Sequence, residues 1–338
     1  IEYYKCGAFE VYIAASPRNI EIFQTGRIVG RDDDKEHFGL IESVELETDA
    51  EDGDYLIIKG RFLMCLLERR IIYPTFNFTK LVSYSQIVMN VVQYNACISG
   101  VRKIPGLVVG CSSGTCWDTE TKLQVSYDNL MEWVYTICEK ISGTANIRLS
   151  KIDNEQYEMI FELSQGTDRS ILQEVNPHII FSDRYNNLLS FTYFTDTSVK
   201  KNYAYVLGKG EGEKRKRTIY FEGTEPSSLE RYEVYVDAKE ISDEEQENGE
   251  TKPLSEEEYS ELLKEKGKQS IVPITMRSES QIAVQSTQFQ YGVDYFVGDF
   301  VTVEHHRFGI RQNKIQLVGM IESFDRNGRN LTPTFKEE

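Results

Sequence analysis

The sequence predicts a mainly β protein with α+β insertions, and three observations support this class. Its 338 residues exceed the length that one hydrophobic core usually serves, so several domains are expected. Short segments rich in β-branched and aromatic residues, bounded by turn residues, fill the first and last parts of the chain. Apolar residues recur at helical spacing in a middle region and again after residue 255.

The first 75 or so residues are expected to form strands of an antiparallel barrel or sandwich. The expected strands are residues 9–13, 20–23, 39–46 and 55–59. Acidic and turn-forming residues at 31–36 and 49–54 separate them.

A helix is predicted at residues 128–142. Ser126 or Asp128 can cap its first turn, and Gly143 is expected to end it. Trp133 is the largest residue on its apolar face, where Cys138 is expected to be a buried thiol.

Two further features surround this helix. Residues 87–92 predict a second helix, although their β-branched side chains would also suit a strand. Residues 146–152 and 157–163 predict two strands, hinged at Asp153 and Asn154. Helices followed by a hairpin indicate a small α+β insertion between two β-rich parts.

Strands are expected to resume at residue 179 and to continue to about residue 236, with a hairpin tip near 208–216. From residue 282 the chain is again expected to be β. Shared strand faces are predicted first for Val301 and Val303, and then for Ile315, Leu317 and Ile321.

A third helix has the clearest boundaries. Ser255 is the expected N-cap, Glu258 completes a capping box, and Gly267 is expected to end the helix. Residues 242–252, which precede it, are so rich in Glu, Asp and Gln that a mobile surface loop is predicted.

The charge of the chain bounds its partners. The formal net charge is −16, from 38 basic and 54 acidic residues. Wrapping around nucleic acid needs clustered Lys and Arg, so this balance disfavours that role. An acidic wall would let DNA slide past without sticking. A simpler interpretation is that the acidity keeps the protein soluble.

The sequence predicts synthesis in the cytoplasm and no membrane-spanning segment. The N-terminal residues lack the basic and apolar pattern of a signal peptide, and no run of about 18 apolar residues occurs.

A search for catalytic and metal-binding patterns predicts neither an enzyme nor a cofactor or metal. The glycine run at 208–214 leads into a strand rather than a helix, so it predicts a hairpin tip and not a phosphate loop. His305 and His306 are adjacent on an expected strand and point to opposite faces. Cys111 and Cys116 are close in sequence but offer neither two further zinc ligands nor an orienting partner for a nucleophile.

Three blocks of sequence are informative through their order. The early block is Gly39-Leu40-Ile41-Glu42, Gly60-Arg61-Phe62-Leu63 and Leu66-Leu67-Glu68-Arg69-Arg70-Ile71-Ile72. The middle block contains Gly166-Thr167-Asp168-Arg169-Ser170, Ile180-Phe181-Ser182, Asn186-Asn187-Leu188, Phe191-Thr192-Tyr193-Phe194, Tyr203-Ala204-Tyr205-Val206 and the series Gly208, Gly210 and Gly212. The late block is Asp294-Tyr295-Phe296-Val297-Gly298-Asp299. In this order, over nearly the whole chain, the sequence resembles the baseplate hub, or tail-associated, proteins of siphophages and their prophage relatives.

The resemblance implies two antiparallel β-barrels like those of tail-tube subunits, with two smaller peripheral modules. The implied division is a first barrel at 1–78 and 179–197, an inserted α+β domain at 79–178, a second barrel at 198–236 and 272–338, and a small helical insertion with an acidic loop at 237–271.

The implied function is that of a virion structural protein at the tip of a siphovirus or prophage tail, assembled in the host bacterial cytoplasm. Three chains would supply six barrels, so a homotrimeric hub ring would cap the tail tube, adapt six-fold to three-fold symmetry and line the DNA exit channel. A closed ring also pairs exposed strand edges. The implied partners are the tail tube or distal tail protein ring, the tape-measure protein and other baseplate proteins, with DNA only in transit. The alternative is a tail-associated cell-wall hydrolase or glycan-binding tip protein.

Six residues are candidates for structural or interface roles: Asp168, Arg169, Arg69, Arg70, Gly298 and Asp299. Asp168 and Arg169 form either a salt bridge that locks the inserted domain to the barrel, which the resemblance favours, or a solvated turn. Arg69 and Arg70 form either a subunit contact or the solvated end of the segment at 62–67, and the sequence leaves both open.

Overall fold

A computed structural model of the chain shows a mainly β protein, with 44% of the residues in strands and 23% in helices, which confirms the predicted class. The structure describes residues 1–338 except 50–52, 99, 154–155, 248–249, 273–274, 283–287, 327 and 337–338. The chain divides into two compact units, the first made of 1–71, 88–117 and 129–165 and the second of 72–87, 118–128 and 166–338. In the described part of the chain, no helix has the length and apolar character needed to cross a membrane.

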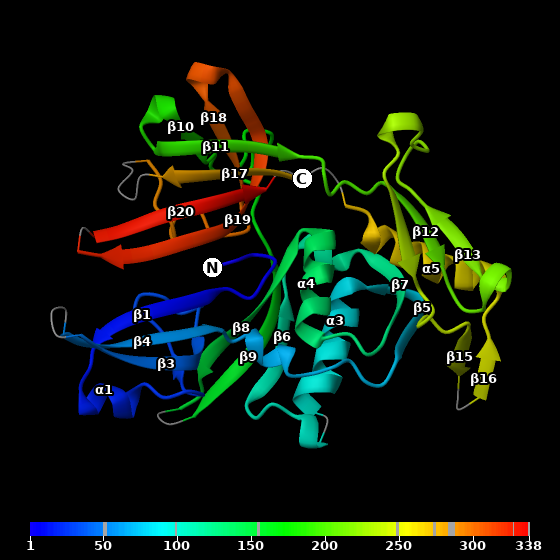
Figure 1. Cartoon of the computed structure of the whole chain (residues 1–338), viewed down its shortest axis with the longest axis horizontal. Coiled ribbons are helices and arrows are strands. Elements are labelled where there is room, and N and C mark those ends of the chain that lie inside the picture. The colour runs from blue at the N-terminus through cyan, green and yellow to red at the C-terminus, as the bar shows by residue number, and fades with distance from the viewer. Residues whose placement is uncertain are drawn as a thin grey trace. The chain divides into compact units, whose positions relative to one another are not determined.

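The first unit contains an antiparallel half-barrel sheet, drawn in blue in Figure 1. Its strands, in the order β1-β4-β3-β2, are β1 (Ala8–Ala14), β4 (Gly53–Phe62), β3 (Gly39–Asp49) and β2 (Ile28–Val29). One face buries Ile41, Leu56 and Ile58, against which Phe9 and Val44 pack. We call this half-barrel the four-stranded sheet.

The strand predicted at residues 20–23 is wrong, because this segment belongs to helix α1 (Pro17–Ile22). The Ser16 hydroxyl accepts a hydrogen bond from the Asn19 N–H at 3.1 Å, and Pro17 occupies the first helical position. An N-cap serine followed by proline favours a helix start, and here it outweighs the β-branched residues that follow.

The first unit also holds a three-stranded sheet beside a helix. The strand order is β6 (Leu107–Ser112), β9 (Tyr157–Gln165) and β8 (Gly143–Lys151), and helix α4 (Leu130–Ile141) packs on β8. The predicted hairpin at 146–152 and 157–163 is confirmed as β8 and β9, whereas Asn154 lies outside the described residues.

Both predicted ends of helix α4 differ from the structure. The N-cap is Asn129, whose side-chain oxygen accepts the N–H groups of Met131 at 3.1 Å and Glu132 at 3.3 Å. The helix ends at Ile141, and its C-cap Ser142 takes the left-handed conformation with φ of 56°. Gly143 is instead the first residue of β8.

The helix predicted at residues 87–92 is confirmed as α3 (Tyr84–Val92), which continues as a π-helical turn at Gln93–Ile98. Its apolar residues Ile87, Val88, Val91 and Val92 are fully buried. A short helix, α2 (Cys65–Glu68), buries Cys65, and Cys138 on α4 is also buried, as predicted.

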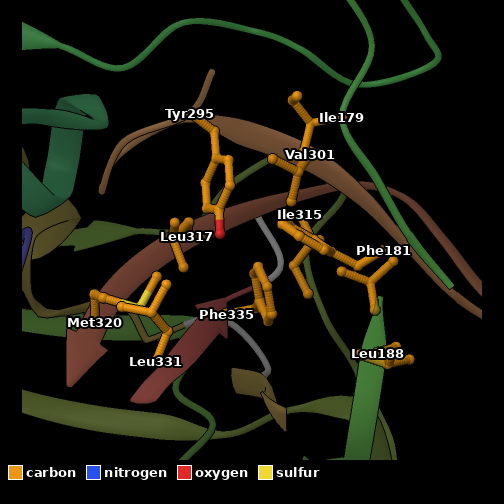
Figure 2. Close-up of a cluster of buried hydrophobic side chains, with 11 residues drawn as sticks. Ile179, Phe181, Leu188, Tyr295, Val301, Ile315, Leu317, Met320, Leu331 and Phe335 are labelled. Atoms are coloured by element: carbon orange, nitrogen blue, oxygen red, sulfur yellow. The ribbon is translucent and has the colours of Figure 1, made fainter. Parts of the chain in front are cut away.

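The second unit contains the second half-barrel, which we call the six-stranded sheet. Its order is β10 (Ile180–Ser182), β18 (Phe300–His305), β19 (Ile310–Asp325), β20 (Gly328–Lys336), β17 (Thr275–Ile282) and β11 (Leu188–Asp196). Figure 2 shows its buried cluster, to which β10, β11, β18, β19 and β20 all contribute side chains. The Phe181 ring meets the Tyr295 ring edge-on at 5.2 Å.

The pairing of β10 and β11 differs from the grouping that the family resemblance implied. Residues 179–197 were grouped with 1–78, but β10 pairs with β18 and β11 with β17. Residues 198–236 were grouped with 272–338, but they supply a separate three-stranded sheet. Such pairings join strands far apart in sequence, and local residue patterns do not specify the partner of a strand.

The predicted buried faces of β18 and β19 are confirmed for every residue except one. Val301, Val303, Ile315 and Leu317 are fully buried, but Ile321 is 65% exposed. A β-bulge between Leu317 and Gly319 shifts the register, so the inward positions change parity beyond it.

The separate three-stranded sheet of the second unit packs against helix α5 (Glu256–Ser270). Its order is β13 (Arg217–Tyr220), β12 (Tyr203–Leu207) and β14 (Glu233–Asp237). The capping box is confirmed: the Glu258 N–H donates to the Ser255 hydroxyl at 3.2 Å, and the Ser255 N–H donates to the Glu258 carboxylate at 3.0 Å.

Gly267 does not end helix α5, which continues to Ser270. A Cβ at Gly267 would lie 2.8 Å from Val206 Cγ2 and 2.9 Å from Tyr220 Cβ. Glycine is therefore required here by the close approach of the helix to β12 and β13.

Two two-stranded sheets complete the second unit. They are β5 (Phe76–Ser83) with β7 (Glu120–Val125), and β15 (Glu244–Glu247) with β16 (Glu250–Pro253). The hairpin of β15 and β16 replaces the loop predicted at 242–252, of which residues 248–249 lie outside the described part. Backbone pairing in a hairpin does not require apolar side chains, so the acidic composition was a poor guide.

Candidate functional site

The middle and late sequence blocks meet in the second unit. The Phe300 N–H at the start of β18 donates to the Thr167 carbonyl at 3.0 Å. The Arg169 N–H returns the contact to the Phe300 carbonyl at 2.8 Å, and Asp168 and Phe300 form a parallel β-bridge. Residues 166–170 therefore act as a short extra strand at the edge of the six-stranded sheet.

Glycines allow the two segments to approach closely. A Cβ on Gly166 would lie 1.9 Å from the Gly298 carbonyl oxygen, so a larger residue there would displace the backbone. Gly298 has φ of +105°, which favours glycine, and its N–H donates to the Leu317 carbonyl at 2.6 Å. The candidate residue Gly298 thus has a backbone role.

Asp299 joins the two segments through its carboxylate, which is buried with 3% of the residue exposed. One oxygen accepts the Thr167 N–H at 2.7 Å. The other accepts Arg169 Nε at 2.9 Å and the Phe296 N–H at 3.1 Å. Three donors, one of them cationic, satisfy a carboxylate that would otherwise be costly to bury. We call this contact the Arg169–Asp299 clamp.

Asp168 has partners of its own. Its carboxylate accepts the Ser170 N–H at 2.9 Å and pairs with Lys314 on β19 at 3.3 Å. Burial alone would raise the pKa of Asp168, but the hydrogen bonds from Ser170 and the nearby Lys314 ammonium outweigh it and lower the pKa. Asp168 and Arg169 thus each form an ion pair with the six-stranded sheet, and not with each other. Their predicted role in holding the inserted domain stays a prediction.

Arg69 and Arg70 belong to the first unit and differ in environment. Arg70 is half-buried and donates from Nε to the Arg102 carbonyl at 2.6 Å, so it has a partner within its own chain. Arg69 caps the end of α2 with its backbone N–H, and its side chain is exposed. The subunit contact considered for Arg69 and Arg70 stays a prediction.

The sequence search missed an ion-pair network in the early block. Arg61 on β4 pairs with Glu42 on β3 at 2.8 Å and with Glu68 on α2 at 2.7 Å. All three residues lie inside the early block, but their spacing along the sequence does not indicate that they meet in the fold. The hydrogen bond from Arg61 lowers the pKa of Glu42. Because about a third of each side chain is exposed, we assign this network a modest contribution to stability.

The glycine run is confirmed as a hairpin between β12 and β13. The Lys216 N–H donates to the Lys209 carbonyl at 2.9 Å, and Lys209 pairs with Asp243 at 2.7 Å. Arg215 fastens the turn by donating from Nε to the Gly208 carbonyl at 2.8 Å.

The remaining chemical candidates lie apart. Cys111 is exposed on β6, and Cys116 is half-buried in the short helical turn at Thr115–Asp118. His305 ends β18, whereas the His306 N–H donates to the Asp183 carboxylate at 2.8 Å. Within the described ranges, no group of three or more His, Cys, Asp or Glu residues is placed to hold a metal ion.

Comparison with solved structures shows that the chain shares its fold with phage and prophage tail proteins. The tail protein from Neisseria meningitidis MC58 is similar with a TM-score of 0.59 and 13% identity, over 100% of this chain and 90% of that one. The prophage MuSo2 43 kDa tail protein from Shewanella oneidensis has a TM-score of 0.55 and 12% identity, over 99% and 92%. Prophage tail protein gp18 from Listeria monocytogenes EGD-e has a TM-score of 0.53 and 10% identity, over 100% and 86%. At these identities the likeness shows a shared fold.

Sequence comparison gives the family. A comparison with curated proteins yields no match. The profile of the Siphovirus ReqiPepy6 Gp37-like protein family matches residues 2–335, which include both half-barrel sheets and the Arg169–Asp299 clamp. The chain therefore belongs to the Siphovirus ReqiPepy6 Gp37-like protein family.

Proposed function

We propose that the chain is a structural component of a phage tail and, more specifically, a subunit of the hub ring at the tail tip. The observation that carries this proposal is the family match over a single chain that holds two half-barrel sheets. Three such chains supply six half-barrels, which matches three-fold symmetry on one side to a six-fold tube on the other. A homotrimer is the assembly that this arithmetic requires.

The edges of the two half-barrels support ring closure. In the described part of the chain, β1 ends the four-stranded sheet and β11 ends the six-stranded sheet. These strands have seven and nine residues, so each offers a row of backbone N–H and C=O groups to a neighbouring strand. The proposed neighbours are other copies of the chain, with the tail tube or distal tail protein ring, the tape-measure protein and other baseplate proteins beyond them.

An acidic face of the four-stranded sheet supports the proposal that the chain lines a DNA channel. The Tyr12 hydroxyl donates to Glu10 at 2.5 Å, and Lys59 pairs with Glu10 at 3.3 Å. Tyr12 on β1 and Glu45 on β3 both lie opposite Ile57 on β4, so they share one face of the sheet. The hydrogen bond to Glu10 and the nearby charges of Glu47 and Glu45 raise the pKa of Tyr12. We propose that this face lines the channel, where it repels DNA phosphates and lets DNA pass in transit.

The remaining sheets are proposed to be peripheral modules of a protein without enzymatic activity. They are the β6-β9-β8 sheet with α4, the β13-β12-β14 sheet with α5, and the two-stranded sheets β5-β7 and β15-β16. The alternative function is a cell-wall hydrolase or glycan-binding tip protein. A zymogram on peptidoglycan distinguishes the hydrolase from the proposed structural role. We expect no cleared zone, and a cleared zone that purified protein reproduces would favour the alternative.

The proposed place in the virion is tested by antibody labelling of purified particles under the electron microscope. We expect the label only at the end of the tail distal to the head, after assembly of the tail in the host cytoplasm. Label along the tube, at the head or on no particle would contradict a hub at the tail tip.

A further inference from the structure

The β13-β12-β14 sheet of the second unit has two faces of different character. Helix α5 covers one of them, where Ala204 and Val206 on β12 are fully buried in the core that the sheet shares with the helix. Tyr205 lies between these two residues on the strand, so it points to the opposite face. The register places Tyr205 beside Ile219 on β13 and Tyr235 on β14. We call Ile219, Tyr205 and Tyr235 the tyrosine row.

The tyrosine row is open to solvent, whereas a third tyrosine on the same face is covered. Tyr205 is 37% exposed, Ile219 46% and Tyr235 58%. Tyr203, two residues before Tyr205 on β12, is only 3% exposed, because the Arg231 guanidinium lies over its ring at 3.5 Å from the centroid. The molecule therefore covers one tyrosine of this face and leaves the two of the row exposed.

Arginine side chains hold both tyrosines of the row in place. Arg231 Nη2 donates to the Tyr205 hydroxyl at 2.9 Å, and that hydroxyl donates to the Glu233 carboxylate at 3.2 Å. Arg215 Nη1 donates to the Tyr235 hydroxyl at 2.9 Å. The hydrogen bonds engage the hydroxyl groups and leave the ring faces to solvent. A ligand that packs on these rings therefore does not have to order them.

The charges beside the row are matched within the face itself. Arg231 pairs with Glu225 at 3.0 Å and with Glu233 at 2.6 Å. Arg215 pairs with Asp237 at 2.6 Å. About half of each of these three acidic side chains is exposed, so the carboxylates can still accept hydrogen bonds from a ligand. A neutral ligand rich in hydroxyl groups can use these acceptors without breaking the ion pairs.

We propose that the tyrosine row binds a neutral polysaccharide, whose sugar rings lie on Tyr205 and Tyr235. A pyranose ring presents C–H groups on its faces and hydroxyl groups at its rim. The C–H groups pack on the aromatic rings, and the hydroxyl groups reach the polar side chains on both sides of the row. The row crosses three strands, about 10 Å from β13 to β14, which suits two linked sugar rings.

The composition of the face favours this ligand over two others. The half-exposed carboxylates repel an anionic polysaccharide. A proline-rich peptide packs on aromatic rings but brings few donors for the carboxylates. The proposal does not rest on the hub ring, because it concerns one face of one sheet. Binding without cleavage is expected, so the zymogram on peptidoglycan stays blank and the symmetry of the assembled tail still tests the hub.

The test uses the whole chain and a neutral tetrasaccharide, cellotetraose, followed by saturation-transfer NMR. The matched control is sorbitol, which has the hydroxyl groups without the ring. We expect saturable binding of cellotetraose at millimolar concentration, with the strongest transfer to the axial C–H protons that face the tyrosine rings. Sorbitol should bind more weakly by about tenfold or more, because it offers no flat apolar face.

Variants place the binding on the row. Tyr235→Ala removes the more exposed ring and should weaken cellotetraose binding about tenfold or more, while the circular dichroism spectrum stays unchanged. Tyr235→Phe keeps the ring and loses only the hydrogen bond from Arg215, so it should bind within about threefold of the natural protein. Tyr185→Ala removes a ring that is 46% exposed elsewhere in the second unit and should leave binding unchanged.

Full binding by Tyr235→Ala, equal binding of sorbitol, or no binding of cellotetraose would overturn the proposal. Binding of a proline-rich peptide without binding of cellotetraose would assign the row to a peptide and overturn the choice of a polysaccharide.

Discussion

The Asp299 carboxylate shows how one buried charge can tie distant segments together. Its partner Arg169 lies 130 residues away, and the Arg169 side chain is only 18% exposed. We expect Arg169→Met to lower the free energy of unfolding by about 3 kcal/mol, because Asp299 would stay buried with one donor fewer. Urea denaturation measures this change.

Lys314→Met is the matched control for the Arg169 variant. It removes a cation from the ion pair with Asp168, in which about a third of each side chain is exposed. Such a pair contributes at most about 1 kcal/mol, so the loss should be small. Equal losses for Arg169→Met and Lys314→Met would show that burial of Asp299 does not matter.

Asp34 predicts an acid-dependent component of stability. Its carboxylate accepts the Glu36 and His37 N–H groups, each at 3.0 Å, and contacts His37 Nδ1 at 2.8 Å. Burial alone would raise the pKa of Asp34, but these contacts lower it from 3.8 to about 2. Because the pKa is lower in the folded state, the stabilisation is present above pH 4 and is lost as the pH falls towards 2.

The variant Asp34→Asn tests this component. The difference in free energy of unfolding between the natural protein and the variant should shrink between pH 5 and pH 2, because protonation removes the same interaction. Urea denaturation at several pH values across this range measures the difference. A difference that stays constant would assign the effect of the variant to something other than the charge of Asp34.

At the scale of elements, features encoded by neighbouring residues were predictable. The capping box at Ser255 and Glu258, the hairpin of β8 and β9, and the glycine-rich turn after β12 all depend on residues close in sequence. Helix α1 was missed although Ser16 and Pro17 signalled its start. The cap of α4 was assigned one or three residues too early, because Ser126, Asp128 and Asn129 all have capping side chains.

Helix α5 gives a prediction at the same scale. Alanine at position 267 would improve helix propensity by about 1 kcal/mol, but its Cβ would crowd Val206 and Tyr220, and overpacking costs about 1 to 3 kcal/mol. We therefore expect Gly267→Ala to lower the melting temperature in calorimetry. Lys264→Ala, at a partly exposed position of the same helix, should change the free energy of unfolding by less than about 0.5 kcal/mol. A higher melting temperature for Gly267→Ala would mean that the helix is not closely packed there.

At the scale of the whole molecule, the sequence indicated the fold class but not the strand partners. β10 pairs with β18, and Ile180 meets Thr302, which no local pattern specifies. The same holds for the candidate site. Asp168 and Arg169 were named as one pair and Gly298 and Asp299 belong to another sequence block, and the fold brings the two pairs together. Arg69 and Arg70 lie in the other unit. They were named with the other four residues although nothing in the sequence placed them in contact with those residues.

The acidic face and the half-barrels have one consequence for assembly. If β1 and β11 pair with other copies, their edges are paired only in the assembled ring. The isolated chain can then remain a monomer until contact with a neighbouring ring of the tail brings the copies together. The interfaces of such a ring should bury more than about 2,000 Å² in total. We therefore propose the homotrimer for the assembled tail, and the assembled tail is the sample that tests it.

The most direct test of the hub proposal is the symmetry of this chain in a cryo-EM reconstruction of the assembled tail, computed without imposed symmetry. We expect three copies around the tail axis, with the two half-barrels of each copy alternating in a ring of six and the face that carries Glu10, Glu45 and Glu47 turned towards the channel. Two or five copies around the axis, or half-barrels outside a common ring, would contradict the proposed hub.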